Sequence, residues 1–376
     1  MTTKINNEHK KLNVPNLRFP EFQGEWHSFL INEICSEFKS GKNIKADSIS
    51  ENGEYPVFGG NGLRGYTASY NHEGLYVLIG RQGALCGNVR SVNGKTYITE
   101  HAIAAAGNEK SNTSFLHYLF IKMNLGQYSD QSAQPGLAVN KLLKIKVVLP
   151  SVSEQTKIAR FLSLLDERIT TQNKIIEDLK KLKCAIIEKV YSEIQGKEYS
   201  YGQLFDVINE RNKQMEYSNI LSASQEKGMV NRDDLNLDIQ FERSNINTYK
   251  IVRKGDYVIH LRSFQGGFAF SDKLGVCSPA YTILRPNSLL EYGYLSNYFT
   301  SQRFIKSLVL VTYGIRDGRS INVDEWLRMK ITIPPKEHQQ YIVKVIRTFE
   351  RKIEDEEAYA AQLSIQKQYL LRQMFI

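Results

Sequence analysis

Residues 150–191 and 334–375 are two copies of one element, and they align without a gap at a shift of 184 positions. Each copy begins with a short strand-like stretch that ends in proline and continues as a long run of helical period. Matched positions include Pro150 and Pro334, Gln155 and Gln339, and Ile169 and Ile353. The polar interruptions of the apolar pattern also coincide, Gln172 with Glu356 and Lys183 with Lys367. Such an internal repeat constrains the fold before any other feature is considered.

The apolar residues of both copies recur at the alternating four- and three-residue spacing of a coiled coil, which predicts a helix-pairing seam. The residues expected to pair are Ile158, Leu162, Leu165, Ile169, Ile176, Leu179, Ile342, Ile346, Phe349, Ile353, Leu363 and Leu370. A helix of about 40 residues is roughly 60 Å long. Because each helix leaves its own domain at the same end, we expect an antiparallel coiled coil with pseudo-twofold symmetry. The alternative, that each helix packs back on its own domain, suits a seam of this length less well.

The repeat continues upstream of the helices in weaker form, since residues 114–120 resemble 293–299 and residues 75–79 resemble 256–260. Short β-branched or aromatic stretches alternate with glycine-rich turns and with one helical segment per domain, near 114–124 and 292–306. This pattern predicts mixed α/β (α+β) globular domains. The expected organisation is a flexible N-terminal arm (1–16), a first globular domain (17–150), a first long helix (151–196), a second globular domain (197–335) and a second long helix (336–376).

The composition narrows the class of protein. With 376 residues the chain can form two or three domains, and its net charge of +9 is compatible with a polyanionic partner without requiring one. The four cysteines are scattered, with no CxxC pair and no histidine at metal spacing, so we expect neither structural zinc nor a disulfide framework. No apolar run approaches the ~20 residues of a membrane span. The start lacks the apolar stretch of a signal peptide, so a cytoplasmic protein with no membrane contact is expected.

Strings that resemble catalytic motifs lack the context that the chemistry requires. Residues 58–62 match a loose S-adenosylmethionine loop, but turn and strand residues follow instead of a helix, and an N-P-P-[YF] tetrad is absent from the sequence. Residues 94–96 end like a phosphate-binding loop, yet Val89 stands where its first glycine should be. We therefore expect no catalytic residues and no metal site in this chain.

A binding role fits the polar residues better. Arg, Lys, Asn and Gln beside glycine-rich turns can contact guanine and adenine edges, and Lys can also contact phosphates. The candidate DNA-binding residues are Lys42, Asn61, Arg64, Tyr66, Arg81, Gln82, Arg90, Arg211, Lys213, Arg262, Ser263, Gln265, Arg316 and Arg319. Any one of them can be an ordinary solvated loop residue, but as a set on repeated domains they favour nucleic-acid binding.

The sequence resembles the specificity subunits of type I restriction–modification systems over essentially its whole length. The resemblance rests on residues 17–26 (LRFPEFQGEW), on the loops at 55–66 and 80–83, and on the junction at 149–162, where Pro150, Glu154 and Gln155 begin the spacer helix. Ile333, Pro334 and Gln339 repeat this junction. In the second half His338 stands where the family usually has an acid, and Tyr281 and Thr282 lie where the first half has Ala102 and Ile103.

The resemblance implies two target-recognition domains, each reading one half of a split double-stranded DNA target in the major groove. The helices would set the number of unread base pairs and dock two modification subunits. Those subunits would carry S-adenosylmethionine, and restriction subunits with ATP and Mg would join the complex, so no cofactor is expected in this chain. The alternatives are a coiled-coil scaffold with two heads that do not bind DNA, and a specificity subunit of a methylation-only complex.

Overall fold

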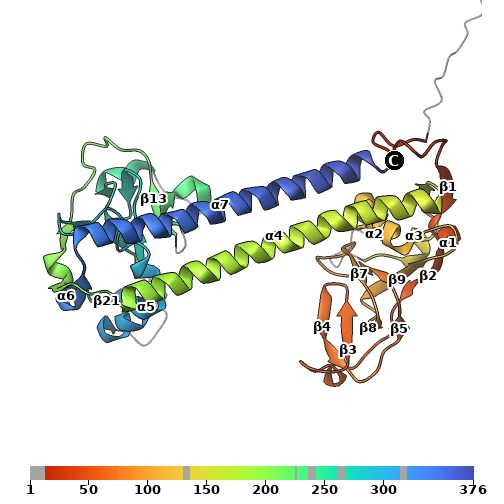
Figure 1. Ribbon diagram of the computed structural model, residues 1–376, viewed down its shortest axis with the longest axis horizontal. Coiled ribbons are helices and arrows are strands. Elements are labelled where there is room, and N and C mark those ends of the chain that lie inside the picture. The colour runs from red at the N-terminus through yellow and green to blue at the C-terminus, as the bar shows by residue number, and fades with distance from the viewer. Residues whose placement is uncertain (1–12, 130–135, 225–226, 236–242, 261–266, 314–319) are drawn as a thin grey trace, which may run out of the picture. The chain divides into compact units, whose positions relative to one another are not determined.

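The computed structural model of the protein describes residues 13–129, 136–224, 227–235, 243–260, 267–313 and 320–376. The chain divides into two compact units, Met1–Asn173 with Ala358–Ile376, and Lys174–Glu357. Two long helices, α4 (Val152–Ser192) and α7 (Lys336–Gln373), contribute residues to both units (Figure 1). The units thus divide the chain inside the helices, whereas the boundaries expected from the sequence fall at the helix ends. Apart from residues 13–16, the expected N-terminal arm lies outside the described residues.

The globular part of the first unit contains two four-stranded sheets. The first sheet is antiparallel, with the order β2 (Cys35–Ser40), β9 (Ala102–Gly107), β6 (Tyr76–Gly80) and β7 (Val89–Val92). The second has the order β4 (Gly62–Thr67), β3 (Tyr55–Gly59), β8 (Lys95–Ile98) and β5 (His72–Glu73), with β3 and β8 parallel. Strand β1 (His27–Leu30) pairs antiparallel with β10 (Lys146–Leu149). The helices are α1 (Ile31–Ile34), α2 (Thr113–Met123) and α3 (Val139–Leu142).

The second unit repeats this plan in reduced form. Its four-stranded antiparallel sheet has the order β12 (Phe205–Ile208), β19 (Thr282–Pro286), β16 (Tyr257–Ile259) and β17 (Phe268–Phe270), which corresponds to β2-β9-β6-β7. Strand β11 (Lys197–Ser200) pairs with β22 (Lys330–Ile333) as β1 does with β10. Three further pairs are β13 (Leu221–Ser224) with β14 (Gly228–Asn231), β15 (Lys250–Val252) with β18 (Gly275–Cys277), and β20 (Thr312–Tyr313) with β21 (Ser320–Ile321). Short helices α5 (Gln302–Ser307) and α6 (Val323–Arg328) complete the unit. The expected mixed α/β domains, each followed by a long helix, are confirmed.

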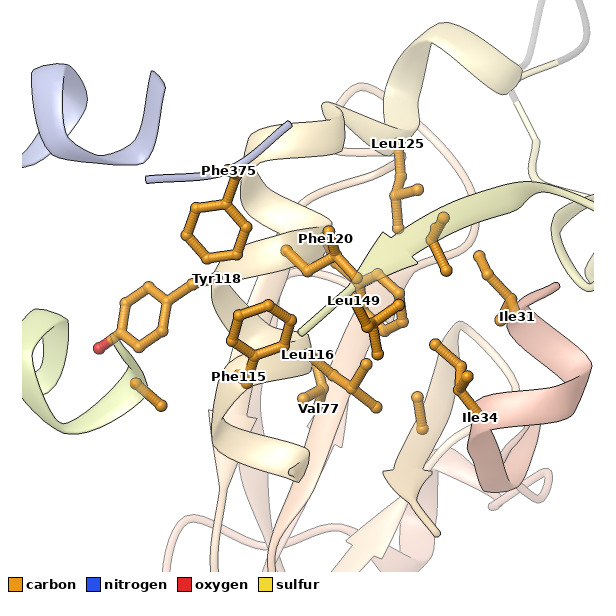
Figure 2. Close-up of a cluster of buried hydrophobic side chains, with 14 of the residues drawn as sticks. Ile31, Ile34, Val77, Phe115, Leu116, Tyr118, Phe120, Leu125, Leu149 and Phe375 are labelled. Carbon is orange, nitrogen blue, oxygen red and sulfur yellow. The ribbon is translucent and has the colours of Figure 1, made fainter. Parts of the chain in front are cut away.

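The C-terminal end of a long helix is part of the hydrophobic core in each unit. In the first unit the core lies between α2 and the β2-β9-β6-β7 sheet, and the end of α7 joins it, with the ring of Phe375 stacked on Phe115 at 5.1 Å between centroids (Figure 2). In the second unit the end of α4 joins the core in the same way, because Ile187 and Tyr191 belong to it. The ring centroids of Tyr191 and Tyr294 are 5.6 Å apart. Burying side chains of this size stabilises each attachment by about 1.5–3 kcal/mol per residue.

The two long helices pack antiparallel within each unit. In the first unit Lys367 of α7 pairs with Asp166 of α4, and in the second Lys183 of α4 pairs with Glu350 of α7 at 3.2 Å. These ion pairs occupy equivalent positions of the repeat, so a lysine that interrupts each apolar seam is compensated by an acid on the facing helix. Every residue expected to pair the helices is buried or half-buried. None of the described helices is both long and apolar enough to cross a membrane.

A buried glutamine anchors the first turn of each long helix to its domain. Gln155 accepts a hydrogen bond from Asn112 N (2.8 Å) and donates to the carbonyls of Lys110 (3.0 Å) and Pro150 (2.9 Å). Gln339 accepts from Glu291 N (2.8 Å) and donates to Leu289 and Pro334 (both 3.0 Å). Both amides are essentially inaccessible to solvent, so each satisfies three buried backbone groups that would otherwise remain unpaired.

The departure from the family pattern at His338 has a physical explanation in the first unit. Glu154, at the equivalent position, is buried and accepts two hydrogen bonds of 2.7 Å from the guanidinium of Arg18. Arg18 belongs to residues 17–26, which pack against α4 through the contact of Phe19 with Phe161 as well. The residue that precedes β11 by the same distance as Arg18 precedes β1 is Glu188, which lies inside α4. The second repeat therefore has no arginine at the equivalent position to pair with an acid at position 338.

The helical segment expected at 292–306 forms differently from its counterpart. Residues 114–124 correspond to α2, but 292–306 contain a turn, a 3₁₀ helix (Tyr298–Thr300) and the short α5. The break occurs at Ser301, whose extended backbone lets its side chain accept from Phe304 N at 3.2 Å and cap α5. Capping of α5 by Ser301 is therefore favoured over continuation of the preceding 3₁₀ helix.

We predict that Gln155→Met and Gln339→Met each lower the free energy of unfolding by about 1–3 kcal/mol, because each leaves three buried backbone groups without a partner. Thermal or urea denaturation of the purified chain measures the decrease. Gln366→Met, at an exposed position of α7, is the control and should change stability by less than about 0.5 kcal/mol. Equal stability of all three variants would show that the glutamines do not anchor the helices.

We also predict an acid-sensitive first unit. Burial, reinforced by nearby Lys367 and opposed by Asp166, lowers the pKa of His117 from 6.5 to about 4. Between these values the unfolded chain binds a proton that the folded chain does not, so stability should fall as the pH drops from 6.5 to 4. In His117→Phe, melting temperatures measured across this range should fall less than in the parent. An unchanged slope in His117→Phe would contradict the prediction.

Candidate nucleic-acid interface

The candidate interface in the first unit is built around the turn between β3 and β4. Gly59 and Gly62 end and begin the hairpin strands, and Gly62 has a φ of +110°, which favours glycine. The string that resembles a cofactor loop is therefore a hairpin turn. The turn packs against the segment after β6, because a Cβ added to Gly60 would lie 2.6 Å from His101 O and 3.2 Å from Gly80 Cα.

Several predicted residues meet at this turn. Asn61 lies in it and is exposed, and Arg64 and Arg90 lie close to its glycines: a Cβ on Gly59 would be 2.9 Å from Arg64 Cδ, and one on Gly62 would be 3.2 Å from Arg90 Cζ. Arg81 follows β6 and is held by its backbone, which donates to His101 O and accepts from Leu137 N, both at 2.9 Å. The hairpin turn and this segment together make one basic cluster.

Two predicted residues of the first unit lie apart from the turn itself. Lys42 is exposed and forms an isolated parallel β-bridge with Thr99, which directly follows β8. A Cβ on Gly59 would be 3.4 Å from the Thr99 hydroxyl. Lys42 thus borders the cluster. Tyr66 is at the other end of β4, where its backbone exchanges hydrogen bonds with Ser50 at 2.8 and 2.9 Å. The structure therefore does not bring Tyr66 to the glycine turn.

The cluster consists of cations without an ion-pair partner among the described residues. Lys42, Arg64, Arg81 and Arg90 form no ion pair with any residue in the described part of the chain, and all except half-buried Arg81 are exposed. Four such cations on neighbouring strands and turns create a local positive potential that attracts polyanions. Arg and Asn side chains on such turns also have the donors and acceptors that match base edges.

Sequence reasoning missed three residues at this site. His101 lies between two polar partners, with Nδ1 3.3 Å from Gln82 Oε1 and Nε2 3.2 Å from Glu100 Oε1, so it fixes the exposed Gln82 amide. Leu63 and Leu85 are 54% and 47% exposed on the same loops, where apolar side chains can contact thymine methyl groups. The position of Leu63 between Gly62 and Arg64 could have indicated it from the sequence. His101 comes close to Gln82 only when the chain folds.

A stable link attaches the sheet that carries the turn to the rest of the unit. His72 of β5 lies 2.9 Å from Glu37 of β2, and the Tyr76 hydroxyl of β6 donates to the same carboxylate at 3.3 Å. Burial alone would raise the pKa of Glu37, but the hydrogen bonds of His72 and Lys39 lower it below its usual value. The link therefore keeps Glu37 ionised and holds the hairpin sheet against the β2-β9-β6-β7 sheet.

In the second unit the described candidates are Arg211 and Lys213, on the segment after β12. Between them Asn212 is buried, donating to Tyr217 O (2.7 Å) and accepting from Tyr217 N (3.2 Å). This anchored asparagine leaves both flanking cations exposed. The remaining candidates, Arg262, Ser263, Gln265, Arg316 and Arg319, lie outside the described residues. Within the described part of the chain, no group of His, Cys, Asp and Glu is placed to hold a metal ion.

The family of this chain follows from comparison with known proteins. A family model of the type I restriction modification DNA specificity domain matches residues 23–181 and 196–364, one match for each repeat. The matches cover most of the chain. The protein therefore belongs to the type I restriction–modification DNA specificity family, as the sequence motifs indicated.

Individual relatives agree with this assignment. The type I restriction enzyme EcoprrI specificity subunit of Escherichia coli is 42% identical over 165 residues, which are 43% of this chain and 40% of that protein. A putative type I restriction enzyme specificity subunit of Haemophilus influenzae, S.HindORF215P, is 25% identical over 351 residues, covering 87% of each chain.

Two solved structures share the fold. The S subunit of a type I restriction–modification system from M. genitalium has a TM-score of 0.62 at 15% identity, covering 96% of this chain and 99% of that one. A structure reported for complex assembly and conformational transition of the type I R-M system has a TM-score of 0.57 at 15% identity, covering 93% and 97%. At this identity the likeness is one of fold.

The packing of the hairpin turn generates a prediction. Gly60→Ala should destabilise the first unit by about 1–3 kcal/mol, because its methyl group would collide with the His101 carbonyl, which is backbone and cannot yield. Gly136→Ala is the matched control, since a Cβ there would meet only Arg81 O at 3.9 Å. Thermal denaturation compares the two. A tolerated Gly60→Ala would mean that the turn is not packed against His101.

Proposed function

We propose that this chain is the sequence-reading subunit of a type I restriction–modification complex and that each globular domain reads one half of a split double-stranded DNA target. The observation that supports this most directly is the basic cluster of Arg64, Arg81 and Arg90 around the hairpin turn of the first domain, where none of the three forms an ion pair within the described ranges. Membership of the specificity family supplies the biological context. Arg211 and Lys213 offer exposed cations in the second domain.

The two domains would read different half-sites because their candidate residues differ. In the first, the reading surface combines a β-hairpin turn with the segment after β6, while in the second the exposed cations flank a buried asparagine after β12. The scaffold below these loops has the same strand order in both domains. Variation in the loops on a repeated scaffold is how a binding protein changes its target without changing its fold.

The paired helices would hold the two reading domains at a set spacing and provide the docking sites of two modification subunits. Burial supports the spacing role, because the seam residues of both helices are buried or half-buried. Exposed apolar side chains support the second: Phe161, Leu164, Ile365 and Tyr369 in the first unit, and Ile175, Leu182 and Tyr341 in the second. Large apolar side chains on the outside of a helix pair are typical of surfaces that another subunit covers.

The chemistry of the complex would belong to its other subunits. Modification subunits would supply S-adenosylmethionine and turn the target adenine out of the duplex for methylation. Restriction subunits would use ATP and Mg for cleavage. This chain would contribute binding, orientation and spacing, and the same reading role would serve a complex that only methylates.

The decisive experiment is to co-express the chain with the modification subunit of its host and to sequence the DNA for methylated adenine. We expect a split motif that is methylated on opposite strands in its two halves and disappears when this chain is deleted. Methylation that persists after deletion, together with failure of any modification subunit to co-purify, would favour the scaffold without DNA-binding heads.

Single substitutions should then separate the half-sites. Arg81→Ala should relax or abolish one half of the motif, weakening target binding by about 1–3 kcal/mol, and leave the other half intact. Arg211→Ala should act on the opposite half. The same methylation sequencing checks both variants. Loss of both halves in either variant, at unchanged thermal stability, would contradict the assignment of one half-site to each domain.

A further inference from the structure

The second unit contains a pocket that neither Arg211 nor Lys213, the described reading residues of this unit, lines. It has a volume of about 430 Å³ and lies between the first half of α7 and the turn that precedes Gly293. Its walls are formed by Glu291, Tyr292, Gln340, Val343, Lys344, Arg347, Thr348 and Arg351. Every one of these residues belongs to the same compact unit, so the pocket is complete within it.

The aromatic wall of the pocket is held in place from several sides. Tyr292 makes an edge contact with Phe270 at 5.2 Å, and a Cβ added to Gly255 would lie 3.4 Å from its ring. Arg347 lies over the same ring, with Cζ 5.5 Å from the centroid. Gln340 donates to the Glu291 carboxylate at 3.1 Å, which joins the turn to the helix. The pocket is thus a built feature of the fold.

The pocket is lined by more cations than carboxylates. Lys344, Arg347 and Arg351 follow one face of α7 over two turns, and none forms an ion pair with a residue in the described ranges. Like charges three and four residues apart destabilise a helix by a few tenths of a kcal/mol per pair. The one carboxylate that lines the pocket, Glu291, accepts from the neutral amide of Gln340, so three cations face a single negative charge. A bound anion would relieve this repulsion.

The basic surface continues beyond the pocket. Gly255, which touches the ring of Tyr292, follows Arg253 and Lys254, and both of these side chains are exposed. Arg253 pairs with Glu210 at 2.8 Å, whereas Lys254 has no ion-pair partner in the part of the chain that the structure describes. Glu210 precedes Arg211, one of the predicted reading residues. Cations therefore run from the segment after β12 towards α7.

The first repeat does not contain this cation face. At the positions of α4 that correspond to Lys344, Arg347 and Arg351 stand Arg160, Ser163 and Glu167, and Thr113 corresponds to Tyr292. A docking site for two identical subunits would be expected to recur in both repeats. A site present in one repeat alone fits a ligand that meets the two halves of the protein differently.

We propose that the pocket binds a backbone phosphate of the DNA duplex, outside the base-reading loops of the second domain. This inference rests on the proposed function. A phosphate suits the site because three cations on a rigid helix face offer charge at fixed positions, and Arg347 can donate two parallel N–H groups to its oxygens. Interactions of this kind position a protein on DNA and carry no sequence information. The pocket would therefore add affinity without altering the target.

The test uses the full chain in complex with its modification subunit and measures binding to target and non-target duplexes over a salt series. In the double variant Arg347→Ala/Arg351→Ala we expect both affinities to fall by the same factor. The slope of log affinity against log salt should become shallower by about 0.9, because the protein then neutralises one phosphate fewer. The methylated motif should remain unchanged.

Arg160→Ala, at the exposed position of α4 that corresponds to Lys344, is the control and should leave the slope unchanged. Thermal denaturation confirms that each variant is folded. An unchanged slope in the double variant overturns the phosphate proposal. So does dissociation of the modification subunit on size-exclusion chromatography, which would identify the pocket as a protein-docking site. If the unsubstituted complex shows no salt-dependent preference for its target, the proposed function fails as well, so the two failures are distinguishable.

Discussion

The rest of the structure depends on the antiparallel packing of the two long helices within each unit. Apolar side chains supply most of its stability, but the register is specified by polar ones: Lys367 with Asp166 in the first unit, and Lys183 with Glu350 in the second. A lysine in a seam is costly unless an acid faces it, so registers that separate these pairs are disfavoured. Because α7 ends in the core of the first unit and α4 ends in the core of the second, helix pairing and domain folding stabilise one another.

This arrangement separates the parts of the chain that must be rigid from those that can vary. The buried amides of Gln155 and Gln339 attach the helices to their domains by equivalent hydrogen bonds. Above this scaffold the loops differ in length and in chemistry. The first domain has a second four-stranded sheet whose hairpin carries the basic turn, and the link from His72 to Glu37 holds that sheet in place. The loops can thus diverge while the paired helices are retained.

The two copies are also unequal in ways that bear on function. The first depends on Arg18, supplied by the segment before β1, to neutralise buried Glu154, and the second replaces that acid by His338. The second has the cation face of Lys344, Arg347 and Arg351 beside Tyr292, which the first lacks. A duplex with two different half-sites is itself asymmetric, so unequal phosphate interactions on the two halves are physically reasonable.

The sequence by itself determined the repeat, the two long helices with their seams and the mixed α/β class, because apolar periodicity and turn residues are local and their copies reinforce one another. It also indicated Arg64 and Arg81, which adjoin glycines, and Arg90 in the same turn-rich stretch, because such residues are visible in the chain. Only the tertiary structure decided which cations lack a counter-charge, that His101 orients Gln82, that a serine interrupts the helix expected at 292–306, and that Tyr292 closes a pocket against α7. These features join residues far apart in sequence, and interactions of that kind arise only when the chain has folded.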